Sequence, residues 1–526
     1  MNISSVSREK PETERHNNAQ YLRREVLIRV ARAYLQGDLE DQVNRIPFAM
    51  RPKKSDAPFR CCIYKERAIL RLRTLGALGF PVEGDDDFTP LSEYANQALR
   101  RSGPNEPVLT VIDIACKGCV SSRYFVTELC QGCLARPCAV NCNFGAVSLV
   151  NGRAVIDPSR CKNCGRCMTL CPYQAIVKIH VPCEEACPVN AIHKGDEGHA
   201  IIDFDKCTSC GRCMRACPFG AIMERSQIID ILRVLAASRK DGRKVVALVA
   251  PAIVGQFPVP FEKIAGALIA LGFADVVPVA AGADLTTLHE SAEFRTRMKS
   301  GKGFMTTSCC PAYVQTVRKH IPELLPFVSD TPTPMHYAAE LARKKYPDSV
   351  TVFIGPCVAK RSEGIHDELI DYVMTFEETG ALFVAAEIEP ASVPACETEY
   401  KASWQGHGFA VTGGVASAVE SLVRHTAPDS EEDSLLVTPI SVNGLSPAGI
   451  KQLKSFACEG CPGNLVEVMA CEGGCIGGAG TVGNPKIAAR EIKCLVAKSA
   501  SLEDLTKQDV EFSPCVVPER IETEDT

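Results

Sequence analysis

Two runs of cysteine near the middle of the chain constrain its fold more than any other feature. Both have the spacing Cys-x2-Cys-x2-Cys-x3-Cys-Pro, over residues 161–172 and residues 207–218. In bacterial iron–sulfur proteins, three cysteines of such a run hold one 4Fe-4S cluster, and the fourth ligates the other cluster of a pair. Short apolar pieces separate the cysteines, so this part of the chain is predicted to fold around clusters.

A variant run precedes the first of these two and supplies it with a partner. The variant reads Cys130-x2-Cys133-x4-Cys138-x3-Cys142. The crossing rule predicts one cluster on Cys130, Cys133, Cys138 and Cys171, and a second on Cys161, Cys164, Cys167 and Cys142. A third is predicted on Cys207, Cys210, Cys213 and Cys187. We therefore predict a ferredoxin-like α+β region over residues 106–225.

Four cysteines of this region remain outside the three sets. Cys183-x3-Cys187 repeats the end of the variant run but lacks the preceding Cys-x2-Cys, which Cys116-x2-Cys119 could supply. A fourth cluster on Cys116, Cys119, Cys183 and Cys217 is one hypothesis, and structural or vestigial thiols are the alternative. Zinc at the Cys-x2-Cys pairs is a further alternative, which the surrounding iron–sulfur spacing disfavours. The expected number of accessory clusters is thus two to four.

The number of cysteines also bears on the cellular compartment. There are 28 in 526 residues, and the polar start of the chain has no apolar core of a signal peptide, so they indicate metal ligands rather than disulfides. No stretch reaches the roughly eighteen continuous apolar residues of a membrane helix. We expect a cytoplasmic protein with no membrane partner.

The charge balance and the phosphate-binding motifs exclude other classes. A net charge of −5, from 58 basic and 63 acidic residues, gives no electrostatic argument for nucleic acid, which calls for a clustered basic face. Neither the dinucleotide glycine motif nor the P-loop motif occurs, so nucleotide and flavin sites are unsupported. Partners are better sought among small redox proteins.

The rest of the chain divides by its hydrophobic pattern. Residues 1–105 are predicted to form a mostly helical cap whose arginines, Arg60, Arg67, Arg71 and Arg73, form a solvated or cluster-facing surface; an alternative is a docking patch for an acidic electron carrier. Residues 226–500 alternate short apolar runs, such as 244–250, 350–354 and 435–438, with helical patterns, which predicts an α/β domain. Residues 501–526 form a polar tail.

Three cysteine-bearing loops follow apolar runs of this α/β domain. They are residues 307–311, residues 355–360 and residues 469–475. Cys310, Cys357, Cys471 and Cys475 supply the four thiolates that a 4Fe-4S cubane needs. Cys309 is left over, and a surplus thiol beside a ligand points to catalysis. These loops resemble those of the iron-iron hydrogenases, and the resemblance extends over about residues 20–490.

The resemblance implies a fold with two parallel-type sheets and an H-cluster buried between them. In the family this cofactor is a cubane bridged by one cysteine, Cys475 by position, to a two-iron subcluster with carbonyl, cyanide and dithiolate ligands. Lys360 matches the lysine that donates to cyanide, the backbone at Pro251 and Ala252 should add a donor, and Met469 matches a methionine packed on the iron ligands.

The resemblance also implies a proton path that ends at Cys309. Its members in this chain are Arg297, Glu293, Glu290 and Ser329. Glu290 and Glu293 stand three apart and so share one helical face, although such a set taken alone is more often a solvated face. A buried relay glutamate should have a raised pKa, because burial disfavours its charge.

Several departures from the best-known hydrogenases are visible. The best-known members have a methionine where this chain has Gly355, and a GGGQP sequence where it has residues 477–483. At the position of Ala252 they have serine or alanine. With the long N-terminal region, these changes resemble the monomeric branch called group B. The sequence assigns no role to the pair Cys61–Cys62 or to the pair Cys458–Cys461. The single cysteines Cys396, Cys494 and Cys515 are expected to be structural.

The resemblance implies reversible reduction of protons to H2 with electrons from ferredoxin, and dependence on hydrogenase maturases. One alternative is a hydrogenase-like iron–sulfur assembly or electron-transfer protein, whose relatives lack the counterparts of Cys309 and Lys360. Another is an H2 sensor, which usually has an added sensory domain. Direction, electron carrier, oligomeric state and oxygen tolerance do not follow from the sequence.

Overall fold

The computed structural model describes residues 17–54, 60–116, 119, 123–425 and 436–506. It contains two compact units, Met1–Leu232 and Arg233–Thr526. Cys515 lies outside the described residues. Among the described helices, none combines the length and the apolar character needed to cross a bilayer.

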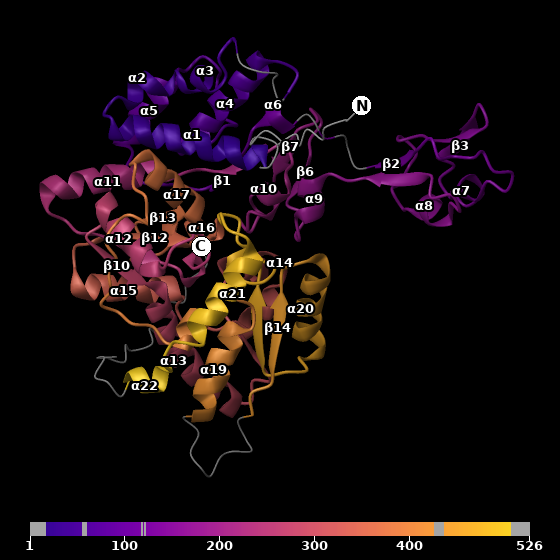
Figure 1. Cartoon of the computed structure of the whole chain (residues 1–526). Helices are drawn as coiled ribbons and strands as arrows, with labels where there is room; N and C mark the ends of the chain where they lie inside the picture. The colour runs from indigo at the N-terminus through magenta and orange to yellow at the C-terminus, as the bar shows by residue number, and fades with distance from the viewer. Residues whose placement is uncertain (1–16, 55–59, 117–118, 120–122, 426–435, 507–526) are drawn as a thin grey trace, which may run out of the picture. The chain divides into compact units, whose positions relative to one another are not determined.

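Among the described residues before 101, helices are the only regular secondary structure (Figure 1). They are α1 (Asn18–Leu35), α2 (Leu39–Val43), α3 (Ile46–Met50), α4 (Ile63–Ala77) and α5 (Leu91–Arg100). The Asn17 side chain caps α1 by accepting from the Ala19 amide. Val30 of α1 and Leu75 of α4 are fully buried where these helices pack, which gives this segment its own apolar core.

The cysteine-rich part that follows is nested. It has an outer layer, whose first strand β1 (Leu109–Val111) pairs antiparallel with its last strand β8 (Ile222–Glu224). Within it lies an inner layer, whose first strand β2 (Arg123–Val126) pairs antiparallel with its last strand β5 (Ile176–Ile179). The inner layer also holds α7 (Pro137–Val140), β3 (Val147–Val150), β4 (Arg153–Ile156) and α8 (Arg166–Leu170). The outer layer also holds α6 (Asp113–Cys116), α9 (Pro182–Ala186), β6 (Ile192–Lys194), β7 (Ala200–Ile202) and α10 (Arg212–Ala216). Residues 123–179 therefore form an insertion within the outer layer.

The second unit is an α/β fold with two parallel sheets, as predicted. The larger has the order β10 (Asp275–Pro278), β9 (Val245–Val249), β12 (Val350–Gly355), β13 (Tyr372–Thr375). The smaller has the order β11 (Met305–Thr306), β15 (Leu465–Met469), β14 (Pro439–Asn443). Every residue of β9, β12 and β15 is buried, as expected for parallel strands covered on both faces.

The strand predicted at residues 435–438 begins later than expected. Leu435 lies outside the described residues, and β14 starts at Pro439, where it pairs with Leu465 at the start of β15. The Thr438 amide instead donates to the side chain of Asn464 at 2.7 Å. Pairing with β15 therefore sets where the strand begins.

Helices connect the strands of this unit (Figure 1). In chain order they are α11 (Ile228–Asp241), η2 (Pro251–Ile253), α12 (Phe261–Leu271), α13 (Val279–Lys299), α14 (Pro311–His320), η3 (Pro322–Phe327), α15 (Pro334–Lys345), α16 (Ala359–Ile365), α17 (Phe376–Ala385), α18 (Trp404–Gly408), α19 (Gly414–His425), α20 (Pro447–Glu459), η4 (Cys475–Gly477), α21 (Pro485–Val496) and α22 (Leu502–Thr506). The first of them, α11, begins in the first unit.

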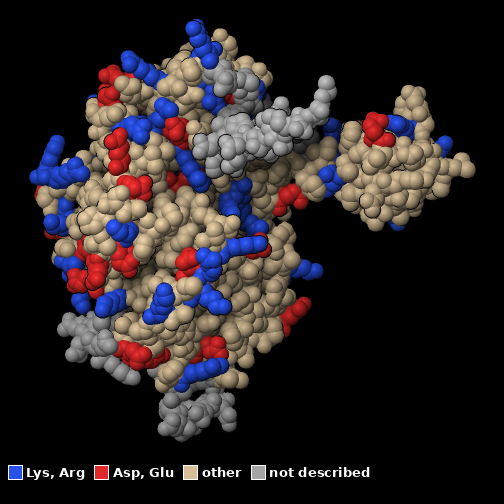
Figure 2. Space-filling view, in the orientation of Figure 1, with Lys and Arg blue, Asp and Glu red and all other residues tan. Residues whose placement is uncertain are grey.

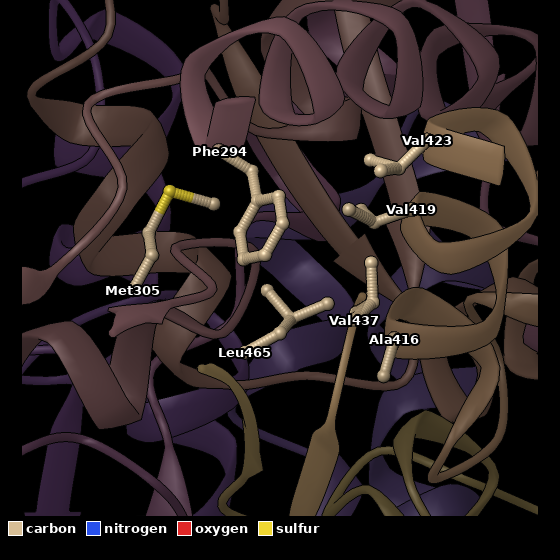
Figure 3. Close-up of a cluster of buried hydrophobic side chains, with 7 residues drawn as sticks. All are labelled: Phe294, Met305, Ala416, Val419, Val423, Val437 and Leu465. Carbon is tan, nitrogen blue, oxygen red and sulfur yellow. The ribbon is translucent and has the colours of Figure 1, made fainter. Parts of the chain in front are cut away.

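An apolar cluster fixes α13 against the smaller sheet (Figure 3). Phe294 of α13 points toward Met305 of β11 and Leu465 of β15, and α19 covers them. The whole cluster comprises Phe294, Met305, Ala416, Val419, Val423, Val437 and Leu465. Helix α13 is thereby held beside the two strands from which two of the cysteine loops emerge.

Candidate iron–sulfur sites and active site

The three cysteine loops of the second unit leave the carboxyl ends of parallel strands. Cys309 and Cys310 follow β11, and Cys310 precedes α14, whose first residue is proline. Cys357 lies between β12 and α16, and Cys471 and Cys475 follow β15. The loops thus come from both sheets, at the edge where parallel α/β sheets place their sites.

Thiols from the two sheets lie close enough to influence one another. Burial and the neighbouring charge of Cys310 raise the pKa of Cys357 and of Cys475 to about 12. Burial likewise raises the pKa of Cys310. All four predicted cubane ligands, Cys471 included, are only partly buried as residues.

The glycine-rich segment after Cys475 holds two of these loops together. The Gly480 amide donates to the carbonyl of Pro356, next to Cys357, at 2.8 Å. A Cβ at Gly478 would lie 2.5 Å from that same carbonyl oxygen, so a side chain cannot be placed there without moving the backbone. This glycine-rich run therefore packs on the Cys357 loop.

Cys309 lies in an apolar setting beside the predicted ligands. It and Cys310 pack against a buried cluster that contains Met469, Phe409 and Val415. Burial, followed by the charge of Glu290, raises the pKa of Cys309 well above the usual value of a thiol. A protonated Cys309 is therefore the stable form.

The predicted relay residues are brought together between α13 and the segment after η3. Arg297 pairs with Glu293 at 2.6 Å, and Glu293 accepts from the Ser329 hydroxyl at 2.7 Å. Burial alone would raise the pKa of Glu293, but donors from Asp330, Ser329 and Thr331, with Arg297, lower it below its ordinary value. Both Glu290 and Arg297 are buried, so the set is not a solvated face.

Glu290 is the inner carboxyl of this set. Its side chain is fully buried, and neither oxygen has a hydrogen-bond partner among the described residues. Burial, reinforced by the charge of Glu293, raises the pKa of Glu290 to about 8, although Ser329 and the Ser308 backbone favour the ionised form. A carboxyl with this pKa can take up and release a proton near neutrality.

A cleft of about 1010 Å³ borders the relay. Its lining includes Ser308, Ser329, Thr331, Thr333, His336 and Glu363. The Ser308 hydroxyl donates to the Thr331 carbonyl at 2.8 Å. Solvent in the cleft therefore reaches the residues that contact Glu293.

Lys360 lies beside the ligand loops with two partners that the sequence analysis did not single out. Its ammonium donates to Glu363 at 2.8 Å and to the Thr333 hydroxyl at 3.3 Å. Its pKa is raised because the charge and the hydrogen bond of Glu363 outweigh burial, and Cys357 and Cys309 lie close enough to act in the same sense. The i,i+3 spacing of Lys360 and Glu363 is a signal that could have revealed the pair, whereas nothing in the sequence points to Thr333.

Two further segments, η2 and β15, contribute residues near the cysteine loops. Pro251 and Ala252 lie in η2 directly after β9, and Ala252 is fully buried. Glu467 of β15, also missed, accepts from the amides of Gly413 at 2.7 Å and Ala416 at 2.9 Å. Burial raises the pKa of Glu467, whose charge also acts on Cys309.

In the first unit, each of the three predicted accessory sets lines one small cavity. The first cavity is lined by Cys130, Cys133, Cys138 and Cys171, the second by Cys142, Cys161, Cys164 and Cys167, and the third by Cys187, Cys207, Cys210 and Cys213. Cysteines far apart in sequence thus meet in the combinations that the crossing rule predicts.

The four remaining cysteines also converge. Burial, then the charges of Cys217 and Cys116, raise the pKa of Cys183 to about 12, and Cys119 acts on it as well. Cys183 lies on α9, Cys116 ends α6 and Cys217 follows α10. The insertion of residues 123–179 separates Cys119 from Cys183 in sequence only. Among the described residues, no three His, Cys, Asp or Glu side chains form a single-ion site.

The arginines of the N-terminal segment serve structural contacts. Arg60 donates to the carbonyl of Phe219 at 2.9 Å and Arg73 to that of Gly220 at 2.6 Å, just after Cys217. Arg71 pairs with Asp85, and Arg67 donates to the Arg51 carbonyl at 2.7 Å. Arg60 and Arg73 therefore match a cluster-facing position. Basic and acidic side chains intermingle on the face shown in Figure 2.

Family models match the chain in three places. Residues 243–479 match the C-terminal domain of the iron-only hydrogenase large subunit, and residues 153–176 and 200–223 each match a 4Fe-4S binding domain. Fold and site together define an iron–sulfur protein in which 4Fe-4S binding segments precede an α/β hydrogenase-type domain.

Characterised relatives agree with this class. Iron hydrogenase 1 of Clostridium pasteurianum is 27% identical over 290 residues, which cover 48% of this chain and 50% of the relative. The periplasmic Fe hydrogenase large subunit of Nitratidesulfovibrio vulgaris is 31% identical over 293 residues, which cover 46% of this chain and 69% of the relative. This chain belongs to the iron-only hydrogenase family. The match spans half the length of the first relative and about two thirds of the second.

Two other similarities extend the comparison. The cytosolic Fe-S cluster assembly factor NAR1 of Yarrowia lipolytica is 23% identical over 300 residues, which cover 42% of this chain and 60% of the relative. The solved structure of FeFe-hydrogenase HydA1 from Chlamydomonas reinhardtii has a TM-score of 0.43 at 24% identity, over 53% of this chain and 92% of that one.

Glu363→Gln is expected to lower the free energy of unfolding of the full chain by up to about 3 kcal/mol, because it leaves the buried Lys360 ammonium without a counter-charge. Denaturant unfolding measures the change. The control is Glu420→Gln, which breaks a pair with Arg424 on α19, whose side chain is 66% exposed, and should cost under about 0.5 kcal/mol. Equal losses in the two variants would contradict the assignment.

Glu290→Gln is expected to change how stability depends on pH. The folded protein keeps a proton on Glu290 up to about pH 8, whereas the unfolded chain loses it near pH 4.3. The stabilisation from the protonated carboxyl is complete below about pH 4.3 and is lost as the pH rises through 8. Relative to the Gln variant, the natural protein should lose up to about 1.4 kcal/mol per pH unit across this window.

Unfolding measured from pH 5 to pH 8 tests this dependence. The surface variant Glu459→Gln on α20 is the control, and its curve should run parallel to that of the natural protein. If the Glu290→Gln curve also runs parallel, Glu290 is ionised throughout and the assignment of a proton-carrying carboxyl is wrong.

Proposed function

We propose that this protein catalyses the reversible reduction of protons to H2, with electrons supplied by ferredoxin or a similar small carrier. The observation that carries the proposal is Cys309. It is a partly buried thiol beyond the four predicted cubane ligands, and it lies within the influence of the buried acid Glu290. A protein that only carried cubanes would have no use for a protonated thiol connected to a carboxyl relay.

The residues present fit an H-cluster. Partly buried cysteines from both sheets meet, and a buried ammonium lies beside them. Cys310, Cys357, Cys471 and Cys475 would hold the cubane, with Cys475 as the bridge. When bound, the H-cluster would supply the low-valent iron at which electrons and protons combine.

The surrounding side chains would orient and enclose this group. Lys360, held by Glu363 and Thr333, would donate to its cyanide ligands, together with the backbone at Pro251 and Ala252. Charge-assisted donors are strong in a pocket from which water is excluded. Met469, packed with Cys309 and Cys310, would keep the pocket apolar.

Protons would enter from the cleft beside Ser329 and Thr331. Glu293, ionised and paired with Arg297, would take the proton through Ser329 toward Glu290. Glu290, with its pKa of about 8, would hold it next to Cys309, which would present it to the metal site. Each step joins groups that the fold holds near one another.

Electrons would arrive one at a time through the accessory clusters. The three sets that line single cavities would each hold a 4Fe-4S cluster, and the remaining four cysteines a fourth. No disulfide joins the described cysteines, which suits a reducing, cytoplasmic setting. Hydrogenase maturases would be needed to install the two-iron subcluster.

The alternative function is iron–sulfur assembly or electron transfer without H2 turnover, and the similarity to NAR1 favours it. Infrared spectroscopy of the anaerobically matured full chain separates the two. Stretching bands of iron-bound carbonyl and cyanide are expected. If they are missing while the cubanes are intact, the assembly or electron-transfer function replaces the proposal.

Cys309→Ala is expected to retain the iron content and the infrared bands but to lose nearly all H2 evolution, because the last proton carrier is removed. Gas chromatography with a chemical reductant measures the rate. Cys494→Ala removes an exposed thiol on α21 and is the matched control, which should evolve H2 at the natural rate. Activity retained in Cys309→Ala would rule out the relay.

A further inference from the structure

Lys194 is an ammonium in direct contact with the fourth cysteine set. It ends β6, and its Nζ donates to the Sγ of Cys116 at 3.3 Å and to the carbonyl of Cys116 at 3.0 Å. It also donates to the carbonyl of Gly198, in the turn between β6 and β7, at 2.8 Å. These three acceptors use all three N–H bonds of the ammonium, so its position is fixed by its own hairpin and by Cys116.

Other donors surround the same set. The Ala200 amide donates to the Sγ of Cys116 at 3.1 Å, and the Ala221 amide to the Sγ of Cys217 at 3.3 Å. Arg60, whose charge also acts on Cys217, donates to the Phe219 carbonyl. One acid opposes these groups: Glu184 acts on both Cys119 and Cys183. The set is therefore rich in donors and close to two cations.

Cations and hydrogen-bond donors next to a bound cluster raise its reduction potential. A 4Fe-4S cluster with four thiolates is an anion, and its reduction adds one more negative charge. A cation at hydrogen-bond distance from a ligand sulfur stabilises the reduced state more than the oxidised state. Hydrogen bonds to the sulfur atoms act in the same sense, and both raise the reduction potential.

We propose that Lys194 raises the reduction potential of a 4Fe-4S cluster held by Cys116, Cys119, Cys183 and Cys217. The inference rests on the accessory clusters of the proposed function but does not require H2 turnover. The cluster takes one electron from a reduced carrier or a neighbouring cluster, which is oxidised by one electron. Lys194 thereby makes this cluster a better electron acceptor. The matched 4Fe-4S segments include Cys217 but not the other three ligands or Lys194.

The first experiment tests the cluster itself. The full chain is prepared with its 4Fe-4S clusters but without the two-iron subcluster, and its iron, zinc and electron paramagnetic resonance signals are measured. Cys183→Ser is expected to lose one cluster, with its four iron atoms. The exposed-thiol control Cys494→Ser should lose none. Unchanged iron in Cys183→Ser, or zinc in place of iron, overturns the proposal.

The second experiment tests Lys194 by redox titration of the same preparation. Lys194→Met removes charge and donor, Lys194→Gln keeps a donor, and Lys194→Arg keeps the charge. The Met variant should lower the midpoint potential of one cluster by at least the equivalent of a tenfold change in the reduced fraction, which is 59 mV for one electron. The Gln variant should lie between Met and natural values, and the Arg variant near the natural value.

Lys178 provides the matched control for Lys194. Lys178→Met removes a lysine that is already paired with Glu185 at 2.6 Å, and it should shift no potential. If Lys194→Met and Lys194→Gln retain their iron and titrate as the natural protein does, Lys194 has no role in setting the potential. Because the two-iron subcluster is absent, this result is independent of the infrared test of H2 chemistry.

Discussion

Everything in the second unit depends on the meeting of ligand loops from two separate parallel sheets. Cys357 comes from the larger sheet, and the other predicted cubane ligands come from the smaller one. The contact is direct at the backbone, where Gly480 donates to Pro356 and Gly478 packs on the same residue. Without metal, burial keeps Cys310, Cys357 and Cys475 protonated, so iron binding would have to displace their protons and its free energy would have to offset that cost. The sheets prepare the geometry, and the metal would complete it.

Helix α13 connects this geometry to the proposed proton path. Phe294 anchors it to β11 and β15 through the apolar cluster, and Ala283 joins the cluster that contains Met469. The same helix carries Glu290 toward Cys309 and presents Glu293 and Arg297 to Ser329 and Asp330. Because one helix holds both the packing and the two carboxyls, the spacing of Glu290 and Glu293 does not depend on a flexible loop.

The sequence predicted the cysteine partition better than it predicted the contacts around it. The spacing of Cys130 to Cys213 was sufficient for the three sets that share cavities, because the crossing rule reflects a recurrent local geometry. Strand alternation gave the α/β class, although β14 began four residues late because its register depends on β15. The partners of Lys360, the amides around Glu467 and the contact of Lys194 with Cys116 join segments distant in sequence, and periodicity carries no information about such pairs. Glu363 is the exception, because its spacing from Lys360 on α16 is local.

The nested arrangement of the cysteine-rich part explains why the fourth set was the hardest to recognise. An insertion between Cys119 and Cys183 would normally separate two halves of a ligand set, since a long flexible loop costs conformational entropy to close. Here the insertion is itself a folded piece whose two ends pair, with Arg123 opposite Ile179 in the β2–β5 ladder. The two ends of the insertion, Arg123 and Ile179, are therefore neighbours in the ladder. The insertion adds many residues between Cys119 and Cys183 without adding an open loop of that length. A complete cluster-binding module can thus be placed inside another without separating the ligands of its host.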